Sequence, residues 1–266
     1  MSSILEAEGI GIAFGGVRAV EAVSFKVAAG QVFSIIGPNG AGKTTLFNLV
    51  SGIYPTDSGR IRIGNRDVTG MRPPALARFG LSRTFQNLQI FGQMTVLENV
   101  MVGRHLRENH NLLAHLTGFG SGEAATRAAA LQFLDQVGLS KEAGQVAANL
   151  SYGAAKRLEI ARALATEPTV LLLDEPAAGC NAVETTDIDR LLVAIAKSGV
   201  AVVLVEHDMK LVMSISDHVL VLDQGRVLTE GKPAEIANDP RVIAAYLGSG
   251  ALDSGTSLSG GTRAAH

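Results

Sequence analysis

Short apolar runs separated by polar and glycine-containing turns divide the first third of the chain into strand-like segments. Such runs cover residues 5–14, 20–27 and 31–36, and each has the length and turn boundaries of a β-strand. We expect antiparallel pairing among these segments. The third run leads into a glycine-rich loop, after which residues 44–52 show apolar positions at helical spacing and end on glycine. The pattern predicts a strand, loop and helix in direct succession.

The hydrophobic pattern changes in the middle of the chain and changes back afterwards. Residues 89–166 are rich in helical spacing, and the clearest helices are predicted at 94–103, 122–137 and 151–166. Apolar β-branched runs then return at 170–173, 200–205 and 219–222. A helical pattern separates each run from the next, as a parallel sheet requires. The predicted fold class is therefore α/β, with a mixed sheet, an antiparallel β part and an inserted α-helical subdomain.

Composition and charge exclude several classes of protein. The 266 residues contain one cysteine and carry a formal net charge of −2, so neither a disulfide framework nor a global basic field is present. We therefore expect no nucleic-acid partner. The apolar run at 200–205 is far shorter than the roughly 18 residues of a membrane span, and the first residues lack the features of a signal peptide. The expected location is the cytoplasm.

The glycine-rich loop has the spacing of a phosphate-binding site. Residues 37–45 read GPNGAGKTT, which fits the pattern G-x-x-x-x-G-K-[ST]. Glycines allow successive backbone N–H groups to converge on phosphate oxygens, and the next helix adds its positive dipole end. Lys43 would reach the terminal phosphates and the Thr44 hydroxyl would bind Mg²⁺. The predicted ATP-binding residues are Gly37, Pro38, Asn39, Gly40, Ala41, Gly42, Lys43, Thr44 and Thr45.

Two carboxylates stand where a magnesium-dependent phosphate site needs them. The apolar run at 170–173 is followed directly by Asp174 and Glu175. An acidic residue at the end of a buried strand can hold the ion, often through water. The next carboxylate can orient and deprotonate an attacking water. We therefore assign Asp174 to the metal and Glu175 to catalysis, with ATP and Mg²⁺ as the cofactors.

These residues, with one further motif, make the chain resemble the nucleotide-binding subunit of an ABC transporter from 5 to 248. The motif is LSYGAAKRLEIARALA at 150–165, which is similar to the ABC signature and the helix that follows it. The resemblance implies a P-loop ABC ATPase core. It also implies that Ser151, Tyr152 and Gly153 contact the ATP held by a partner subunit, because a helix N-terminus forms an anion site.

Other positions match the same family residue by residue. The resemblance makes Gln86, in RTFQN, a glutamine that contacts both the magnesium ion and the attacking water, and His207 the switch histidine on the γ-phosphate. Phe14 matches the aromatic residue that stacks on adenine, although a strand aromatic can equally belong to the core. The loop at 177–185 matches the family's D-loop. The family therefore implies three catalytic residues, Glu175, His207 and Gln86, and three metal ligands, Thr44, Gln86 and Asp174.

The chain departs from the commonest family pattern at four positions. Tyr152 replaces a second glycine, and Ala154 replaces a polar residue that is usually glutamine. Cys180 and Ala182 stand where leucine and proline are usual. These changes bear on the closure of a dimer and leave Lys43 and the acidic pair intact.

Three local features resemble the LivG-type ATPases of branched-chain amino-acid importers. They are the stretch at 83–103, the long segment at 104–126 and the ending at 241–248. The resemblance implies two transmembrane permease subunits, a second ATPase subunit that is either a sister chain or a second copy, and, indirectly, an extracytoplasmic substrate-binding protein. The chain itself would lie on the inner face of the plasma membrane. The alternatives are importers of urea, amides or other amino acids, lipopolysaccharide export, and a soluble ABC ATPase acting on ribosomes or DNA.

The resemblance also predicts how the chain is divided. We expect one ABC ATPase domain at 4–248, with a nucleotide-binding core at 4–88 and 167–248 and a helical subdomain at 89–166. The tail at 249–266 is rich in glycine and serine, so we expect it to be disordered. An apolar group after Gln86 could be core or could form a permease-binding groove; its members are Leu88, Ile90, Phe91, Met94 and Val96.

Overall fold

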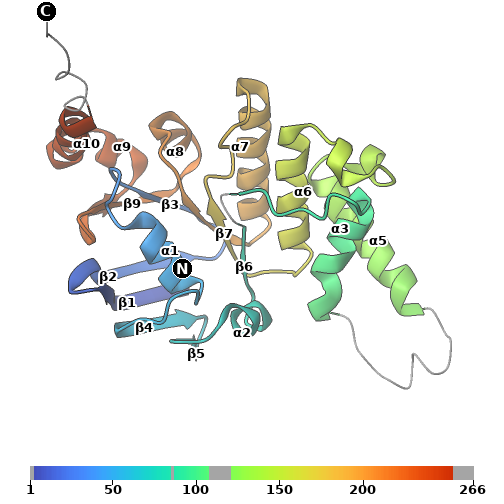
Figure 1. The fold of residues 1–266 in the computed structure, drawn as a ribbon, viewed down its shortest axis with the longest axis horizontal. Helices are drawn as coiled ribbons and strands as arrows, with labels where there is room; N and C mark the ends of the chain where they lie inside the picture. Colours follow the sequence, from blue (N-terminus) through green and yellow to red (C-terminus); the bar gives the residue numbers. More distant parts are fainter. Residues whose placement is uncertain (1–2, 85–86, 108–120, 254–266) are drawn as a thin grey trace, which may run out of the picture.

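A computed structural model describes residues 3–84, 87–107 and 121–253 and shows an α/β protein with two sheets (Figure 1). The strands are β1 (Ser3–Phe14), β2 (Val17–Ala28), β3 (Val32–Ile36), β4 (Ser58–Ile63), β5 (Arg66–Asp67), β6 (Leu81–Arg83), β7 (Val170–Asp174), β8 (Ala201–Val205), β9 (His218–Asp223) and β10 (Arg226–Gly231). The α-helices are α1 (Lys43–Val50), α2 (Pro73–Arg78), α3 (Val96–Gly103), α5 (Ser121–Gln136), α6 (Tyr152–Leu164), α7 (Ala182–Lys197), α8 (Met209–Ile215), α9 (Pro233–Ala237) and α10 (Pro240–Asp253). The 3₁₀ helices are η1 (Arg104–Arg107), η2 (Ser140–Glu142) and η3 (Ala147–Asn149).

The smaller sheet is antiparallel and has the strand order β2-β1-β4-β5. Its β1–β2 hairpin confirms the antiparallel pairing expected for the first two segments. The expectation was wrong for the third segment, because β3 pairs in parallel with β8 and β9 in the other sheet. All five residues of β3 are buried, and a strand covered on both faces is typical of a parallel sheet.

The larger sheet has the order β10-β9-β3-β8-β7-β6 and is parallel except for its β9–β10 hairpin. Strands β3, β7 and β8 are buried along their whole length. Val205, at the end of β8, pairs with Ile35 of β3 and with Asp174 of β7. The three central strands therefore end at the same level, and the loops that follow them meet at one edge of the sheet.

Alternate residues of these strands face two different cores, as the period of a strand requires. One face packs with α1 against the antiparallel sheet, so that α1 lies between the two sheets (Figure 1). The opposite face packs against α6 and α7. A third cluster joins β9 to α8, α9 and α10. Helix α1 is thus packed against both sheets, and this packing fixes the end of the glycine loop that precedes it.

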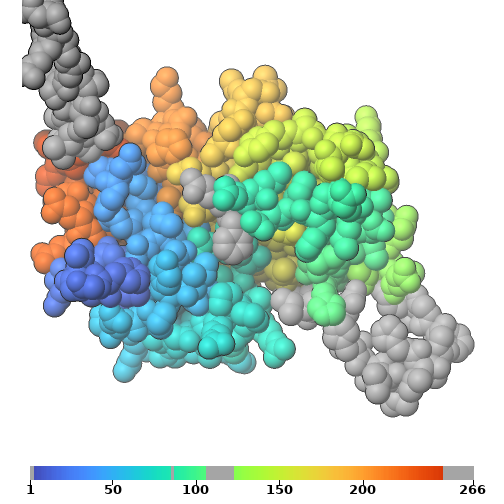
Figure 2. Space-filling model, in the orientation of Figure 1, coloured from blue at the N-terminus to red at the C-terminus, as the bar shows by residue number. Residues whose placement is uncertain are grey.

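The helical segment shares its core with the sheet. Val96, Leu134 and Leu158, from α3, α5 and α6, belong to the same buried cluster as Leu171 and Val202 of the sheet. α6 lies between α7 and the green helices α3 and α5 (Figure 1), and in the space-filling view the yellow and green parts of the chain adjoin (Figure 2). The helices predicted at 44–52, 94–103, 122–137 and 151–166 are confirmed to within two residues at each end. Because these helices pack against the sheet, the helical segment has no separate hydrophobic core of its own among the described residues.

The last helix extends further than expected. We expected a disordered tail from residue 249, but α10 continues to Asp253. Ala251 and Leu252 are strong helix formers, and each added residue of a formed helix gains a backbone hydrogen bond. Residues 254–266 lie outside the described part of the chain.

A buried arginine joins β6, β7 and α1. Arg83 Nη2 lies 3.4 Å from Asp174 Oδ2, and both side chains are 8 % exposed. Arg83 Nη1 donates to Asn48 Oδ1 at 2.7 Å and to Ser51 Oγ at 2.6 Å, and the guanidinium lies over the ring of Phe47, 5.0 Å from its centre. Burial raises the pKa of Asp174, while Arg83 opposes that rise. The arginine therefore neutralises the carboxylate that ends β7.

A second acid is buried where β8 ends. Glu206 is 3 % exposed, and its Oε2 accepts a hydrogen bond from the His207 amide at 3.2 Å. Its Oε1 is buried without a hydrogen-bond partner in the described part of the chain. Burial raises the pKa of Glu206 from 4.5 to about 7, against the lowering effects of the His207 amide and side chain. At neutral pH the fold therefore holds a carboxyl group that resists ionisation.

The first prediction concerns the arginine. Arg83→Gln removes the cation that pairs with the buried Asp174 carboxylate, so we expect the free energy of unfolding to fall by about 3–5 kcal/mol, as for other broken buried pairs. Urea unfolding followed by circular dichroism measures it. The double variant with Asp174→Asn should recover part of the loss. Arg60→Gln, at an exposed position of β4, is the control. A loss no larger than that of the control would contradict the role assigned to Arg83.

The second prediction concerns the pH dependence of stability. Because the pKa of Glu206 is raised by folding, its favourable contribution is complete below pH 4.5 and is lost as pH rises to about 7. Glu206→Gln should therefore raise the melting temperature at pH 8 and leave it unchanged below pH 4.5. A shift from 4.5 to about 7 sets an upper limit of roughly 3 kcal/mol. Thermal melts from pH 4 to 8 measure it, with the exposed Glu230→Gln as control, and an equal gain at every pH would contradict it.

Candidate active site

The loop from 37 to 45 connects β3 to α1 and wraps around its own lysine. Gly37 has a φ of 153°, and a Cβ there would lie 2.2 Å from the carbonyl oxygen of Leu222, so only glycine fits. Lys43 Nζ donates to the carbonyl oxygens of Gly37 at 2.7 Å and Pro38 at 3.0 Å. The loop thus folds into a cradle with an ammonium group inside it.

The other residues of the predicted loop differ in exposure. Pro38 and Ala41 are buried, whereas Asn39, Gly40 and Thr44 are exposed. Burial lowers the pKa of Lys43, while the charges of Glu175 and Asp174 raise it. Lys43 is therefore a cation close to both acids of the next strand, and its hydrogen bonds to carbonyl oxygens can be exchanged for phosphate oxygens.

Two oxygen donors next to this loop suit Mg²⁺. Thr44 supplies a hydroxyl oxygen at the start of α1, and Asp174 supplies a carboxylate oxygen where β7 ends. Magnesium bound with a nucleotide usually takes one or two such protein ligands together with phosphate oxygens and water. No group of three or more His, Cys, Asp or Glu side chains arranged for a metal occurs among the described residues. The Thr44 hydroxyl and the Asp174 carboxylate are the kinds of donor that fit an ion bound together with phosphate.

The two predicted catalytic side chains that the structure describes lie side by side. His207 Nδ1 is 3.4 Å from Glu175 Oε1, and the Glu175 side chain is 22 % exposed. Glu175 has a φ of 48°, an unfavourable value for a residue with a side chain. Its N–H donates to the carbonyl oxygen of Val205 at 3.0 Å, which holds that conformation. The third predicted catalytic residue, Gln86, lies outside the described residues.

Phe14 is at the surface and not in the core. It is 45 % exposed and meets Tyr54 edge to face, with ring centres 5.4 Å apart. The same hairpin is tied to the glycine loop, because Glu21 N donates to Gly225 O at 2.8 Å and Gly225 N donates to Ala41 O at 2.9 Å. An exposed aromatic pair close to the loop is suited to stacking on a base.

The signature residues are placed elsewhere. Ser151 is the N-cap of α6 and accepts a hydrogen bond from the Ala154 amide at 3.3 Å. Tyr152 is 46 % exposed, and Gly153 N donates to Glu184 Oε1 of α7 at 3.2 Å. The structure thus gathers the loop, Asp174, Glu175 and His207 into one site and sets residues 151–153 against α7.

Sequence reasoning missed three charged residues around these sites. They are Arg83, Glu206 and Glu184. A signal existed for Glu206, since it directly follows an entirely apolar run, as Asp174 does. No local pattern marks Arg83 as the partner of an acid 91 positions later. Glu184 is recognisable only as the N3 residue of a helix whose N-cap is Asn181.

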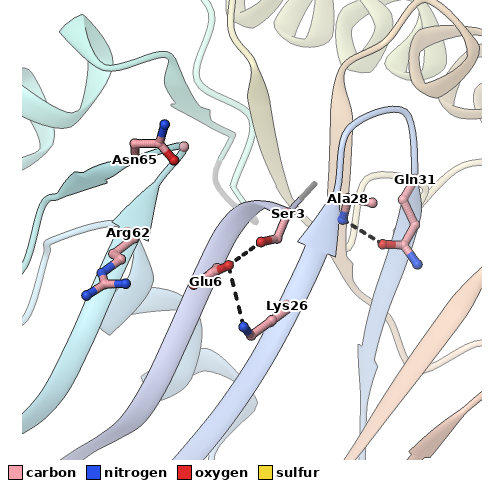
Figure 3. Close-up of a pocket in the computed structure, with 8 residues that line it drawn as sticks. Ser3, Glu6, Lys26, Ala28, Gln31, Arg62 and Asn65 are labelled. Atoms are coloured by element: carbon pink, nitrogen blue, oxygen red, sulfur yellow. Dashed lines mark hydrogen bonds and ion pairs between the residues drawn. The ribbon is translucent and has the colours of Figure 1, made fainter. Parts of the chain in front are cut away.

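A polar hollow of about 550 Å³ lies on the antiparallel sheet and takes no residue from the predicted site (Figure 3). Glu6 of β1 binds Ser3 and lies 3.6 Å from Lys26 Nζ of β2, as the dashed lines of the figure show. These charges neutralise one another across neighbouring strands, which is the usual arrangement on a solvated sheet face.

The apolar group after Gln86 divides between core and surface. Val96 is fully buried, whereas Phe91 is 46 % and Met94 39 % exposed. Met94 also lines a hollow of about 580 Å³ together with Met101 and Val102 of α3. The guanidinium of Arg162 lies 5.2 Å from the centre of the Phe91 ring. Phe91 and Met94 are therefore exposed at the surface, whereas Val96 belongs to the core.

Two family models match the chain. An ABC transporter model matches residues 20–178, which include the glycine loop, both acids and the signature. A branched-chain amino acid ATP-binding cassette transporter model matches residues 226–251. Across the described residues, no helix is both long and apolar enough to cross a membrane.

Curated relatives match over nearly their whole length. The chain is 46 % identical over 249 residues to the high-affinity branched-chain amino acid transport ATP-binding protein BraF of Pseudomonas aeruginosa, covering 92 % of this chain and 98 % of that protein. It is 42 % identical over 251 residues to LivG of Escherichia coli strain K12, with the same coverage.

Solved structures agree with this result. An ATP-binding cassette of an ABC transporter in its ADP conformation has a TM-score of 0.82 and 33 % identity, covering 93 % of this chain and all of that one. A nucleotide-free cassette has a TM-score of 0.80 and 33 % identity, covering 91 % and 97 %. The chain is therefore a member of the ABC transporter family and carries that family's ATP-binding cassette.

Proposed function

We propose that this chain is the ATP-hydrolysing subunit of an importer of branched-chain amino acids. The observation that carries the proposal is the convergence of Lys43, Asp174, Glu175 and His207 at one edge of the parallel sheet. The match to BraF and LivG along the chain supports the cargo. ATP-driven transport of an amino acid is thus the function that best fits both.

In the proposed reaction, water attacks the γ-phosphorus of ATP in line with the leaving ADP. Glu175 orients the water and accepts its proton. Lys43 and His207 stabilise charge on the γ-phosphate oxygens, which is the main contribution a protein makes to phosphoryl transfer. Mg²⁺, when bound by Thr44, Asp174 and Gln86 with the phosphates, would neutralise further charge. Phe14 would hold the adenine by stacking.

The proposed active unit contains two ATPase chains. Residues 151–153 are set against α7 and not in the site of their own chain, so they would serve the nucleotide of a partner. Each ATP would lie between the loop of one chain and the Ser151–Gly153 segment of the other. The second chain is either a second copy or a sister ATPase.

The proposed membrane partners are two permease subunits, fed from outside by a substrate-binding protein. The exposed Phe91 and Met94, with the adjacent hollow along α3, provide an apolar surface for a permease segment. On this proposal the chain binds the inner face of the plasma membrane through the permeases. The ATPase itself does not contact the transported amino acid.

The third prediction separates catalysis from nucleotide binding. Glu175→Gln should lower ATP turnover by roughly 10²- to 10⁴-fold, the usual effect of losing a general base, while fluorescent ATP binds as well as before. Lys43→Ala should instead weaken that binding, because the ammonium at the centre of the loop is removed. Phosphate release and fluorescence titration measure the two quantities. Unchanged turnover in the first variant would remove Glu175 from the mechanism, and full affinity in the second would remove Lys43.

The fourth prediction concerns the cargo. Deleting the gene should abolish high-affinity uptake of radiolabelled leucine, isoleucine and valine while leaving urea and amide uptake intact. Wild-type protein should restore transport and Glu175→Gln should not. Loss of urea or amide uptake with normal leucine uptake would identify a different importer built on the same ATPase.

A further inference from the structure

The N-terminus of the signature helix is occupied by a carboxylate of the same chain. Glu184 Oε1 accepts the Gly153 N–H at 3.2 Å, and its Oε2 accepts the Asn181 N–H at 3.1 Å. One side chain of α7 therefore satisfies a donor of α6 and a donor of its own helix cap. The carboxylate lies where an anion at the α6 N-terminus would lie.

The fit between these groups is close. A Cβ at position 153 would lie 2.5 Å from both the carboxyl carbon and Oε1 of Glu184, so a glycine is needed for the carboxylate to reach the amide. A second contact lies beside the first. The Tyr152 ring packs against Gly179, in the loop before α7. Two adjacent contacts thus hold the start of α6 against the start of α7.

The position of Glu184 on its helix explains why it is held there. Asn181 caps α7 by accepting from the Val183 and Glu184 amides, each at 3.0 Å. Glu184 completes the capping box by accepting from the Asn181 amide, an arrangement that fixes the first turn of a helix. The capping box therefore holds the carboxylate in place, and the bond to Gly153 is made by the oxygen left over.

We propose that Glu184 is a built-in competitor of the partner's nucleotide. This inference rests on the proposed function, in which Gly153 and Ser151 bind the γ-phosphate held by another chain. A phosphate cannot use the Gly153 N–H while the carboxylate does, and two anions repel each other at this distance. Closure of the two chains over ATP must first release Glu184. The contact therefore opposes closure until binding of ATP and of the partner outweighs it.

The test measures association driven by ATP. The parent is the full chain with Glu175→Gln, in which bound ATP persists. It is studied alone and, where the second ATPase subunit is a different chain, with that chain. Sedimentation in ATP and Mg²⁺ gives the dissociation constant of the pair. Adding Glu184→Gln keeps an acceptor for the capping box but removes the charge. It should lower this constant roughly tenfold, since bonds to charged groups are the stronger ones.

The matched control is Asp187→Asn, which removes a negative charge one turn further along α7. Asp187 pairs with Arg190 at the surface and should leave the dissociation constant unchanged. A second readout is the exchange rate of the Gly153 amide in the free chain without ATP. It should rise with Glu184→Ala and stay the same with Asp187→Asn.

Each outcome decides a different point. Tighter association with Glu184→Gln but not with Asp187→Asn supports the competitor. Equal or weaker association with Glu184→Gln overturns it and leaves the proposed function standing. Absence of ATP-driven association in the parent overturns the proposed site between two chains, and with it the role of Glu184 as a competitor.

Discussion

The architecture depends on three parallel strands that are buried on both faces and end at the same level. β3, β7 and β8 contain no exposed residue, and Val205 is in register with both of its neighbours. Backbone and side-chain polar groups cannot be left without partners inside such a layer. The chain therefore places its polar chemistry immediately after these strands, at the edge where the glycine loop, the acidic pair and His207 meet.

In this arrangement the charged side chains lie at the edge of the hydrophobic core. The contacts that position them therefore also contribute to the stability of the fold. Asp174 is neutralised by Arg83, which also binds α1 through Asn48 and Ser51. Glu206 Oε1 has no hydrogen-bond partner in the described part of the chain, and burial raises the pKa of this carboxyl group. The left-handed conformation of Glu175 is held by the end of β8. Groups that would bind a nucleotide are thus positioned by contacts that also stabilise the sheet.

Much of this could be predicted from the sequence, because the relevant signals are local. The loop spacing predicted the turn between β3 and α1 that wraps around Lys43, and the apolar run before Asp174 and Glu175 predicted a buried strand that ends there. Strands β4, β5, β6 and β10 were missed, since each is short and its charged residues interrupt the apolar pattern. The sheet to which β3 belongs depends on pairing with residues about 170 positions away, which no short window records. The contacts of Arg83 and Glu184 are of the same long-range kind.

The surface proposed for the permease and the signature are joined by one helix. Phe91 lies under Arg162 of α6, and Val100 of α3 shares a core with Leu158 of α6. Because this core is continuous with the sheet, a partner pressing on Phe91 and Met94 acts on a packed body and not on a loosely tethered lobe. Arg162 lies near the C-terminal end of α6, and the N-terminal end of the same helix is where Gly153 meets Glu184. On the proposed function, permease binding at Phe91 and release of Gly153 from Glu184 would therefore act on opposite ends of the same helix.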